Sequence, residues 1–378
     1  MLDLNRYRSL FPIAERCAFL NHAGVSPVNT RAVEAMRAFN ELTAHVSFAD
    51  LFEDVANTLL DLRQRIATLV NAHSADEIVL MPNTATGINT AALSLPLHPG
   101  DNVLVLDGDY PANIYPWMNL AHRGVLTKFV PTRDGGLDLD LLRARIDSHT
   151  RVIALSSVLF ATGFRNDLVA VGKLCREYGL FFVVDGIQSL GALPFDVQEA
   201  YVDFLACGSL KWLLGPSGGG FLYVRDELME ELVAGAYVGA ASVVNPENFL
   251  DYNFTLQPTA ARFALGSQNF LGMLGVHASI SLIQEVGIDQ IAERVLALTS
   301  VAIDDLRRRG YRFSASTAPE HRSGIVIVEV DDPLAASQRL KAAGIITVPR
   351  GKGVRLAPHF YNTEEELLRV GEVLGNAR

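Results

Sequence analysis

The sequence predicts an α/β fold in which a mostly parallel, seven-stranded sheet lies between helices. Two observations predict it. Between residues 76 and 224, short apolar runs alternate with helical segments, which is the pattern of a doubly wound sheet. The runs are apolar almost throughout, rather than at every second residue, as expected for strands that are covered on both faces.

The expected elements of this sheet follow one another at regular intervals. Strands are expected over 77–81, 102–107, 125–130, 151–157, 180–185, 203–207 and 220–224. Helices are expected over 84–95, 112–123, 138–146 and 167–179. Each helix thus returns the chain to the edge of the sheet at which the next strand begins.

The pattern changes after about residue 265. Two long amphipathic segments, 272–287 and 289–310, are followed by short strands and further helices, which predicts a small α+β domain. We therefore expect a large domain over 21–265 and a small C-terminal domain over 266–378. Residues 1–20 are expected to pack with the small domain.

Composition narrows the class of protein. The chain has 378 residues and a net charge of -10, which argues against nucleic acids and anionic membrane surfaces as partners. No apolar run reaches the roughly 18 residues of a membrane helix, and the N-terminus does not resemble a signal peptide. The three separated cysteines form no metal or redox motif and suit a reducing compartment. We expect a cytoplasmic protein without a metal centre.

Two polar segments follow expected strands at the edge where ligands bind in such sheets. The segment NTATGINT, 83–90, begins a helix with small residues and Thr86, which suits a phosphate group, although an ordinary helix cap would look the same. Asp185 ends a very apolar strand, and Gln188 follows three residues later. A carboxylate there needs a cationic partner, unless it simply caps the next turn.

Two further segments carry isolated cations. Lys211, with Ser209 two residues before it, lies between an apolar run and a glycine-rich run. Arg350 and Arg355 are separated by glycines and apolar residues, which suits a carboxylate clamp. The alternative for the lysine is a surface side chain with an extended stem, and for the arginines a solvated turn.

Together the four segments describe a site for pyridoxal 5′-phosphate. A lysine can form a Schiff base with the cofactor, an aspartate can pair with its pyridinium nitrogen, and a helix N-terminus can hold its phosphate. An arginine can bind the carboxylate of an amino-acid substrate. Each group taken alone has an ordinary structural explanation, but the four together predict one cofactor site.

Several blocks in this order resemble the class V, cysteine desulfurase-like members of the fold-type I pyridoxal phosphate-dependent enzymes. The resemblance covers nearly the whole chain. The blocks are FLNHAGVSP (19–27), NTATGIN (83–89), DYPANIYPW (109–117), VVDGIQSLG (183–191), SLKWLLGPSGGGFLYV (209–224), RFALGSQN (262–269) and VRLAPHFYNTEEEL (354–367).

The resemblance implies a role for each matching residue. Lys211 is similar to the Schiff-base lysine and Asp185 to the partner of the pyridinium, so both are expected to be catalytic. Gln188 resembles the residue that hydrogen-bonds the phenolic oxygen of the cofactor. Ala85 and Thr86 resemble the phosphate-binding turn.

The resemblance also implies a homodimer with shared active sites. Ser267, in GSQN, is similar to a residue that reaches the phosphate of the cofactor in the neighbouring subunit. Asn21 and His22 match a block that borders the substrate. For His22, a turn or core histidine is an equal alternative.

Two departures from the family pattern affect the cofactor site. Many relatives carry a histidine directly before the lysine, where this chain has Leu210, so Ser209 or a backbone amide is expected to replace its contact with the phosphate. The position of the histidine that stacks on the cofactor ring is Pro111. Tyr110 is expected to supply the ring face, with Tyr115 or Trp117 as alternatives and core packing open for each.

A third departure concerns the reaction. Desulfurases accept sulfur on a cysteine in a small-domain loop, and the corresponding stretch PRGKGVRLAP has none. We therefore expect an aminotransferase that acts on an amino acid. A C–S lyase, a desulfurase-like enzyme or an epimerase of the same family are the alternatives. A catalytically degenerate interaction protein is a further one, although it would be expected to lack Lys211 or Asp185.

Overall fold

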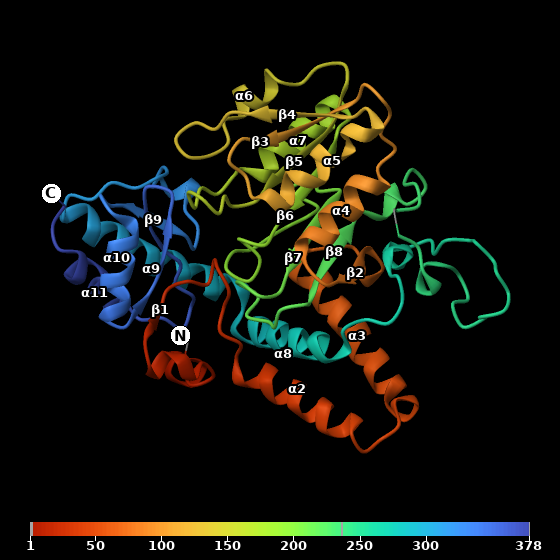
Figure 1. Cartoon of the computed structure of the whole chain (residues 1–378), viewed down its shortest axis with the longest axis horizontal. Coiled ribbons are helices and arrows are strands. Elements are labelled where there is room, and N and C mark those ends of the chain that lie inside the picture. Colours follow the sequence, from red (N-terminus) through yellow and green to blue (C-terminus); the bar gives the residue numbers. More distant parts are fainter. Residues whose placement is uncertain (1–2, 236, 378) are drawn as a thin grey trace.

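The computed structural model describes residues 3–235 and 237–377, and a seven-stranded sheet lies at its centre (Figure 1). The strand order is β2-β8-β7-β6-β5-β3-β4, and only β8 runs antiparallel to its neighbours. The strands are β2 (Ile78–Met81), β3 (Asn102–Leu106), β4 (Leu126–Val130), β5 (Thr150–Ser156), β6 (Phe181–Asp185), β7 (Phe204–Gly208) and β8 (Gly220–Val224). The predicted mostly parallel sheet is confirmed, and each strand begins and ends within one residue of its expected limits.

The two faces of the sheet are covered by different helices, so the strands are buried on both sides. Side chains that alternate along β5, such as Ile153 and Ala154, belong to two separate apolar clusters. On one face pack α3 (Phe48–Val70), α7 (Leu168–Tyr178) and α8 (Phe270–Val286). On the other face pack α4 (Thr84–Ser94) and α5 (Tyr115–Asn119). This arrangement explains why the strands read as continuous apolar runs.

Capping residues begin several of these helices. Asn83 accepts a hydrogen bond from the backbone N–H of Thr86 at the start of α4, and Asp167 accepts one from Ala170 at the start of α7. Asp138 caps α6 (Leu139–Arg143) in the same way. Such caps satisfy the free N–H groups of a first helical turn.

The single helix expected over 112–123 is wrong. The chain instead forms a short 3-10 turn, Pro111–Asn113, then α5, then a second turn over Leu120–Arg123. Pro116 has no backbone N–H to donate to the preceding turn, and its ring crowds that turn, so a continuous helix cannot pass through it.

The helices α2 (Thr30–Thr43) and α8 lie across the lower side of the molecule, and α3 adjoins them there (Figure 1). α2 and α3 precede the sheet in sequence, and α8 packs against both of them. α9 (Ile288–Arg308) follows α8 after Gly287, at an angle of 81°. No single described helix is long and apolar enough to cross a membrane, and only the bent pair α8–α9 meets both criteria together.

A smaller lobe of strands and helices lies at the C-terminal end. Its antiparallel sheet has the order β11-β12-β9, with β9 (Val326–Glu329), β11 (Val348–Arg350) and β12 (Gly353–Leu356). Two helices, α10 (Pro333–Ala342) and α11 (Glu364–Leu374), pack on it.

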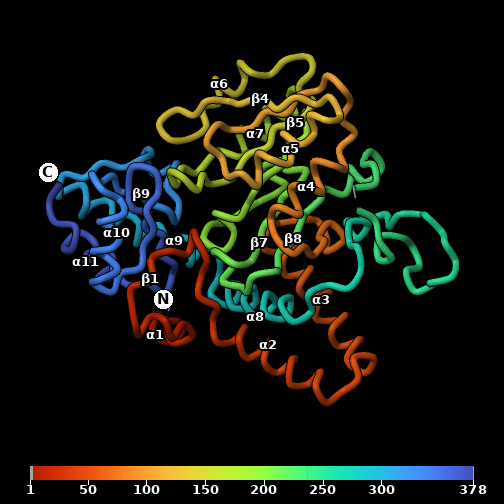
Figure 2. Tube along the Cα trace, in the orientation of Figure 1, coloured from red at the N-terminus to blue at the C-terminus, as the bar shows by residue number. Residues whose placement is uncertain are grey.

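The N-terminal segment lies against this lobe (Figure 2). β1 (Ala18–Phe19) pairs with β10 (Ile345–Ile346), and Arg8, at the end of α1 (Leu4–Arg8), forms an ion pair with Glu366 at 2.6 Å. Side chains of α8 share an apolar cluster with the central sheet, whereas α11 belongs to a separate cluster with Ala18 and Leu20. The domain limits after residues 20 and 265 stay predictions.

Candidate active site

Polar side chains gather where the parallel strands end. β6 ends at Asp185, and β7 is followed directly by Ser209 and Lys211. The backbone N–H of Gly208, the last residue of β7, donates to the hydroxyl of Thr84 at 2.9 Å, which ties the start of α4 to the same edge. The candidate residues from distant parts of the sequence therefore meet at one edge of the sheet.

Lys211 is mostly buried, and its environment makes it a better nucleophile. Loss of hydration lowers the pKa of its ammonium group to about 8, with Asp185 opposing the shift and Arg355 and Arg350 adding to it. Its Nζ atom lies 5.4 Å from the centre of the Tyr110 ring. A substantial fraction of the amine is thus neutral near physiological pH and able to attack a carbonyl carbon.

The turn that carries Lys211 is held in place by distant helices. Leu214 donates its backbone N–H to the carbonyl of Lys211 at 3.0 Å and adopts a positive φ of 58°. The carbonyl of Leu214 accepts hydrogen bonds from Ser279 of α8 at 2.9 Å and from Asn29, the cap of α2, at 3.3 Å. A leucine in the left-handed region is a strained conformation that persists only when surrounding contacts enforce it.

Asp185 is a buried carboxylate with spare capacity for a cation. Within the described chain its carboxylate takes part in one hydrogen bond, accepted by Oδ1 from the N–H of Ile187 at 2.9 Å. Burial raises its pKa to about 7, and the nearby carboxylate of Asp109 adds to this rise while Lys211 opposes it. The second oxygen is therefore available to a protonated ring nitrogen.

Gln188 links the N-terminal block around Ala23 to the residue after Lys211. Its side-chain carbonyl accepts from the indole N–H of Trp212 at 3.0 Å, and its amide donates to the carbonyl of Ala23 at 3.1 Å. The carbonyl of Trp212 in turn accepts from Nε2 of His359 at 3.0 Å. The residue after Lys211 is thus fixed by both lobes, with one amide hydrogen of Gln188 left over for another acceptor.

Asn21 and His22 have different positions. Asn21 Oδ1 accepts a hydrogen bond from Arg355 at 3.0 Å. His22 is fully buried, donates from Nδ1 to the carbonyl of Ala357 and accepts at Nε2 from the hydroxyl of Tyr361, each at 2.8 Å. Burial lowers its pKa well below the usual value, so the ring is neutral and packed among other aromatic side chains.

A cleft of about 730 Å³ opens beside the start of α4. Ala85, Thr86 and Ser267 of the same chain line it, together with Asn83. Asn83 Oδ1 accepts from both the N–H and the hydroxyl of Thr86, at 2.9 and 3.1 Å. The cleft thus brings Ala85 and Thr86 together and places Ser267 of the same chain beside them; that Ser267 reaches the phosphate in a neighbouring subunit stays a prediction.

Ser209 does not face this cleft. Its hydroxyl is fully buried and lies 2.6 Å from the carbonyl of Pro216 and 2.9 Å from that of Gly219. It therefore closes the glycine-rich loop after Lys211. A contact with the cofactor phosphate stays a prediction for this residue.

The three aromatic residues considered for the ring face are separated by the fold. Trp117 is fully buried in the core, whereas Tyr115 is 65% exposed. Tyr110 alone lies beside Lys211, and its ring packs edge-on against Phe160 with centroids 5.1 Å apart. The geometry brings only Tyr110 of this group to the site.

Comparison with known proteins identifies the family of the chain. The family model "Aminotransferase class-V" matches residues 18–370. The chain belongs to the class V aminotransferase family. Enzymes of this family depend on pyridoxal phosphate, and the chain is a pyridoxal phosphate-dependent enzyme of class V.

Curated relatives of this class V enzyme carry two kinds of name. It is 28% identical over 364 residues to the "uncharacterized aminotransferase YcbU" of Bacillus subtilis, which spans 96% of this chain and 95% of that protein. It is also 28% identical over 393 aligned positions to a "probable cysteine desulfurase" of Methanothermobacter thermautotrophicus, with the same two coverages. Sequence similarity therefore does not decide between the two activities.

Solved structures of the enzyme C-DES match the class V enzyme closely. One is a variant with glycine covalently linked to its pyridoxal phosphate, with a TM-score of 0.88 and 25% identity over 98% of this chain and 99% of that one. Another is described as the complex of cystine C–S lyase C-DES with its reaction product, cysteine persulfide. The predicted fold-type I architecture is confirmed.

The residues of the class V enzyme fit the cofactor. A buried amine with a lowered pKa, a buried carboxylate with a free oxygen and an unpaired buried guanidinium, that of Arg355, lie in one region. Burying such groups without partners costs free energy, because buried charges need partners. A ligand that pairs with them would remove this cost. An aldehyde, a ring nitrogen and carboxylate groups would satisfy them.

One charged residue of the site was not predicted from the sequence. Asp109, just beyond β3, is buried and accepts from the N–H of Tyr110 at 2.6 Å and from the hydroxyl and N–H of Ser156 at 2.6 and 2.8 Å. It connects the Tyr110 loop to the end of β5 and raises the pKa of Asp185. An acidic residue close behind an apolar strand was the signal, as it was for Asp185.

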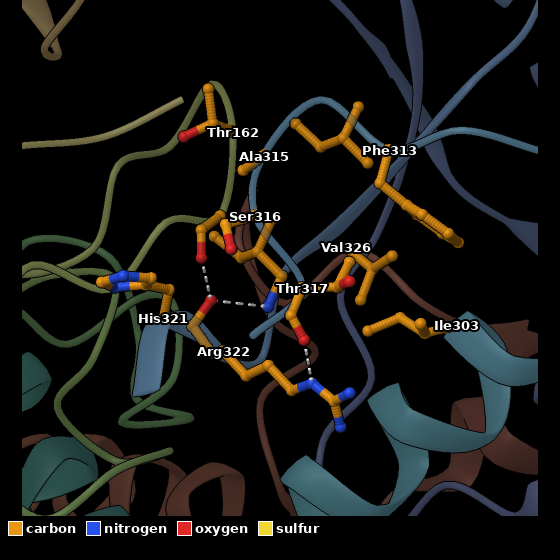
Figure 3. A pocket seen from close by; sticks show the side chains of 13 residues that line it. Thr162, Ile303, Phe313, Ala315, Ser316, Thr317, His321, Arg322 and Val326 are labelled. Atoms are coloured by element: carbon orange, nitrogen blue, oxygen red, sulfur yellow. Dashed lines mark hydrogen bonds between the residues drawn. The ribbon is translucent and has the colours of Figure 1, made fainter. Parts of the chain in front are cut away.

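Two other findings lie outside this site. A hollow of about 20 Å³ lies near Thr162 and Phe313. Figure 3 shows the side chains that line it, among them Arg322, whose Nε donates to the carbonyl of Thr317 at 2.7 Å. The hollow has room for roughly one water molecule and contains none of the predicted site residues. Within 3–235 and 237–377, no cluster of His, Cys, Asp or Glu side chains is arranged to hold a metal ion.

Acid is expected to destabilise the enzyme through a buried histidine. Burial lowers the pKa of His359 to about 4, against about 6.5 in an unfolded chain. The stability that this neutral ring contributes is complete above pH 6.5 and is lost as the pH falls toward 4, by up to about 3 kcal/mol. Urea unfolding at a series of pH values measures this loss.

The variant His359→Asn isolates this contribution. It should flatten the pH dependence of the unfolding free energy between pH 6.5 and 4.5, whereas His149→Asn, which alters an exposed ring, should leave it unchanged. Equal slopes for the parent and His359→Asn would contradict the assignment.

Proposed function

We propose that this class V enzyme is an aminotransferase, in which Lys211 attaches the cofactor and carries protons during the reaction. One observation carries the choice against a persulfide-forming desulfurase. Cys207 interacts electrostatically with Lys211 but is fully buried, Cys175 is buried on α7, and Cys17 lies in the N-terminal segment, so neither buried thiol is exposed to accept sulfur from a substrate beside Lys211. Burial also raises the pKa of the Cys207 thiol well above its usual value, which makes it a poor nucleophile.

The bound cofactor supplies an electron sink for the pair of electrons left when the Cα proton of the substrate is removed. Lys211 is the base that takes this proton, because its pKa of about 8 suits transfer near neutral pH. The same amine, once protonated, would be the group that returns the proton in the next step. With water supplying the oxo oxygen, the substrate would leave as a 2-oxo acid while its amino group stayed on the cofactor, and a second 2-oxo acid would take up that amino group with release of water.

The remaining residues bind and orient. Asp185 holds the proton on the ring nitrogen, and Gln188 donates its spare amide hydrogen to the phenolic oxygen. Ala85 and Thr86 hold the phosphate at the start of α4, supported by the cleft that they share with Ser267. Tyr110 packs against the ring. Asn21 orients Arg355 through their 3.0 Å hydrogen bond, so that the guanidinium receives the α-carboxylate.

A C–S lyase is the second candidate, favoured by the 25% identity to C-DES. In that case Lys211 would remove the same Cα proton, but a sulfur substituent would leave from Cβ. An epimerase would need a second proton donor on the opposite side of Cα. The three reactions share the binding residues and differ in what happens after proton removal.

We further propose that the enzyme is a cytoplasmic homodimer. Its support is the segment after β8, where Phe249, Leu250, Tyr252 and Phe254 are each at least 70% exposed, since apolar side chains clustered in this way mark interaction surfaces. In Figure 1 this segment extends away from the body of the molecule. Light scattering of the purified protein at a monomer mass would overturn the dimer, and cell fractionation would test the location.

Product analysis separates the candidate reactions. The purified enzyme with added pyridoxal phosphate is incubated with single amino acids, with and without a 2-oxo acid such as 2-oxoglutarate. An aminotransferase requires the acceptor and yields a new amino acid in equal amount. Ammonia, pyruvate or sulfide formed without acceptor would establish a lyase, and loss of optical activity alone would establish an epimerase.

A further inference from the structure

The surroundings of Lys211 hold more positive charge than the described chain neutralises. The rings of Tyr110 and Phe160 connect Lys211 to Arg350 through contacts, and the charges of Arg355 and Arg350 both lower the pKa of the Lys211 ammonium group. Asp185 is the carboxylate that opposes this effect. The bound substrate is therefore expected to bring negative charge.

Arg355 is the clearest case of an unpaired cation. Its side chain is 2% exposed and forms one hydrogen bond, to the neutral amide oxygen of Asn21. Its Nε atom is buried without a partner among the described residues. Burial is the main cause that lowers the pKa of Arg355 to about 10, and the charge of Arg350 lowers it further. No carboxylate among the described residues opposes this shift. A buried guanidinium in this state is completed by an anionic ligand.

Arg350 is a second such group, built into the same hairpin. In the antiparallel pair of β11 and β12, Arg355 lies opposite Val348, and Arg350 is two residues beyond Val348. Because side chains alternate along a strand, Arg350 and Arg355 project from the same face. The Arg350 guanidinium packs 5.4 Å from the centre of the Phe160 ring, and its buried Nε atom also lacks a partner in the described chain.

Phe160 relates this second guanidinium to the reaction centre. Its ring contacts that of Tyr110, which in turn lies beside the Lys211 ammonium group. Contacts through Phe160 and Tyr110 thus connect Arg350 to Lys211, while the charge of Arg355 has the larger effect on the pKa of Lys211 of the two arginines.

We propose that the preferred substrate is an α-amino acid with a second anionic group on its side chain, such as a dicarboxylic amino acid. Arg355 receives the α-carboxylate, because this group is bonded to the Cα atom that Lys211 must reach. Arg350 receives the side-chain anion. The inference rests on the proposed action on amino acids, but it holds equally for transamination, elimination or epimerisation.

The first test compares acidic amino acids with their neutral isosteres. With the holoenzyme, kcat/KM for aspartate or glutamate is expected to exceed that for asparagine or glutamine by about 100-fold, the effect of a well-placed buried charge pair. Arg350→Gln should reduce this ratio to within a few-fold by slowing only the acidic substrates. Arg355→Gln should slow acidic and neutral substrates alike, and Arg312→Gln, at an exposed arginine of the same lobe, should alter neither.

The second test measures binding without turnover. Succinate and glutarate carry two carboxylates but no amino group, and they are titrated into the holoenzyme while its cofactor absorbance and tryptophan fluorescence are recorded. They should bind more tightly than propionate and butyrate, and Arg350→Gln should remove the difference. Turnover of neutral amino acids with no preference for acidic ones, or equal binding of mono- and dicarboxylates, would overturn the inference while the proposed function stood. Tight, Arg350-dependent binding of dicarboxylates without any transamination would support the inference and refute the aminotransferase.

Discussion

Replacing Lys211 by alanine is expected to lower kcat/KM by about 10⁴-fold, at the upper end of the effect of removing a general base. The expected loss follows from two roles of one amine. In the proposed function Lys211 attaches the cofactor, and its lowered pKa of about 8 allows it to take and return a proton near neutral pH. After borohydride reduction, mass spectrometry should find the cofactor on the peptide that contains Lys211 in the parent and on no peptide of the variant.

Two controls separate these roles from a general effect on folding. Lys173→Ala removes an exposed lysine on α7 and should retain full activity. A small primary amine such as methylamine, added to Lys211→Ala, should restore part of the proton transfer, because it can occupy the space of the missing amine. Covalent cofactor in Lys211→Ala at the level of the parent would mean that another residue forms the attachment.

The central sheet could be predicted from the sequence because its signals are local. All strands except the edge strand β4 are apolar runs that are buried on both faces, and the turns between the units contain glycine and proline. The broken helix around Pro116 was also a local signal, and the apolar periodicity of 112–123 outweighed it in the prediction. α2 and α3 received no prediction, although α8 packs along both.

The residues of the candidate site also fall into those with a local sequence signal and those whose contacts depend on the fold. Asp185 and Lys211 could be found because each follows an apolar strand directly, and parallel strands place their carboxyl ends together. The partners of other residues come from distant segments, as Tyr361 does for His22 and Trp212 for Gln188. No pattern in one sequence reveals such pairs, since they depend on how the chain folds and, for His22 and Tyr361, on how the two lobes pack. For this reason the sequence left His22 open between a substrate contact and a core position.

Replacing Asp185 by asparagine is expected to have opposite effects on activity and on the stability of the cofactor-free protein. Activity should fall by about 10³-fold, because a neutral amide stabilises a protonated ring nitrogen far less than a buried carboxylate does. The cofactor should still attach to Lys211, which sets this variant apart from Lys211→Ala.

The stability effect follows from the raised pKa of Asp185, about 7 in the folded protein against about 3.9 in an unfolded chain. Below pH 4 the carboxyl is protonated in both states and costs nothing. As the pH rises from 4 to 7 the unfolded state loses its proton first, so the folded state is progressively destabilised, by up to about 4 kcal/mol above pH 7. Without cofactor, Asp185→Asn should therefore unfold at a higher temperature than the parent at pH 8, and at nearly the same temperature at pH 4.

Pyridoxal phosphate should reverse this order, because a protonated ring nitrogen gives the parent carboxylate the cation that it lacks. Thermal unfolding with and without cofactor measures both halves of the effect, and Asp140→Asn, at an exposed position of α6, is the matched control. A carboxylate that served only to support the fold would give the opposite result, with Asp185→Asn less stable than the parent in the absence of cofactor. Greater stability of the variant without cofactor, combined with weaker stabilisation by cofactor, is the pattern expected of a residue kept for chemistry at the expense of the fold.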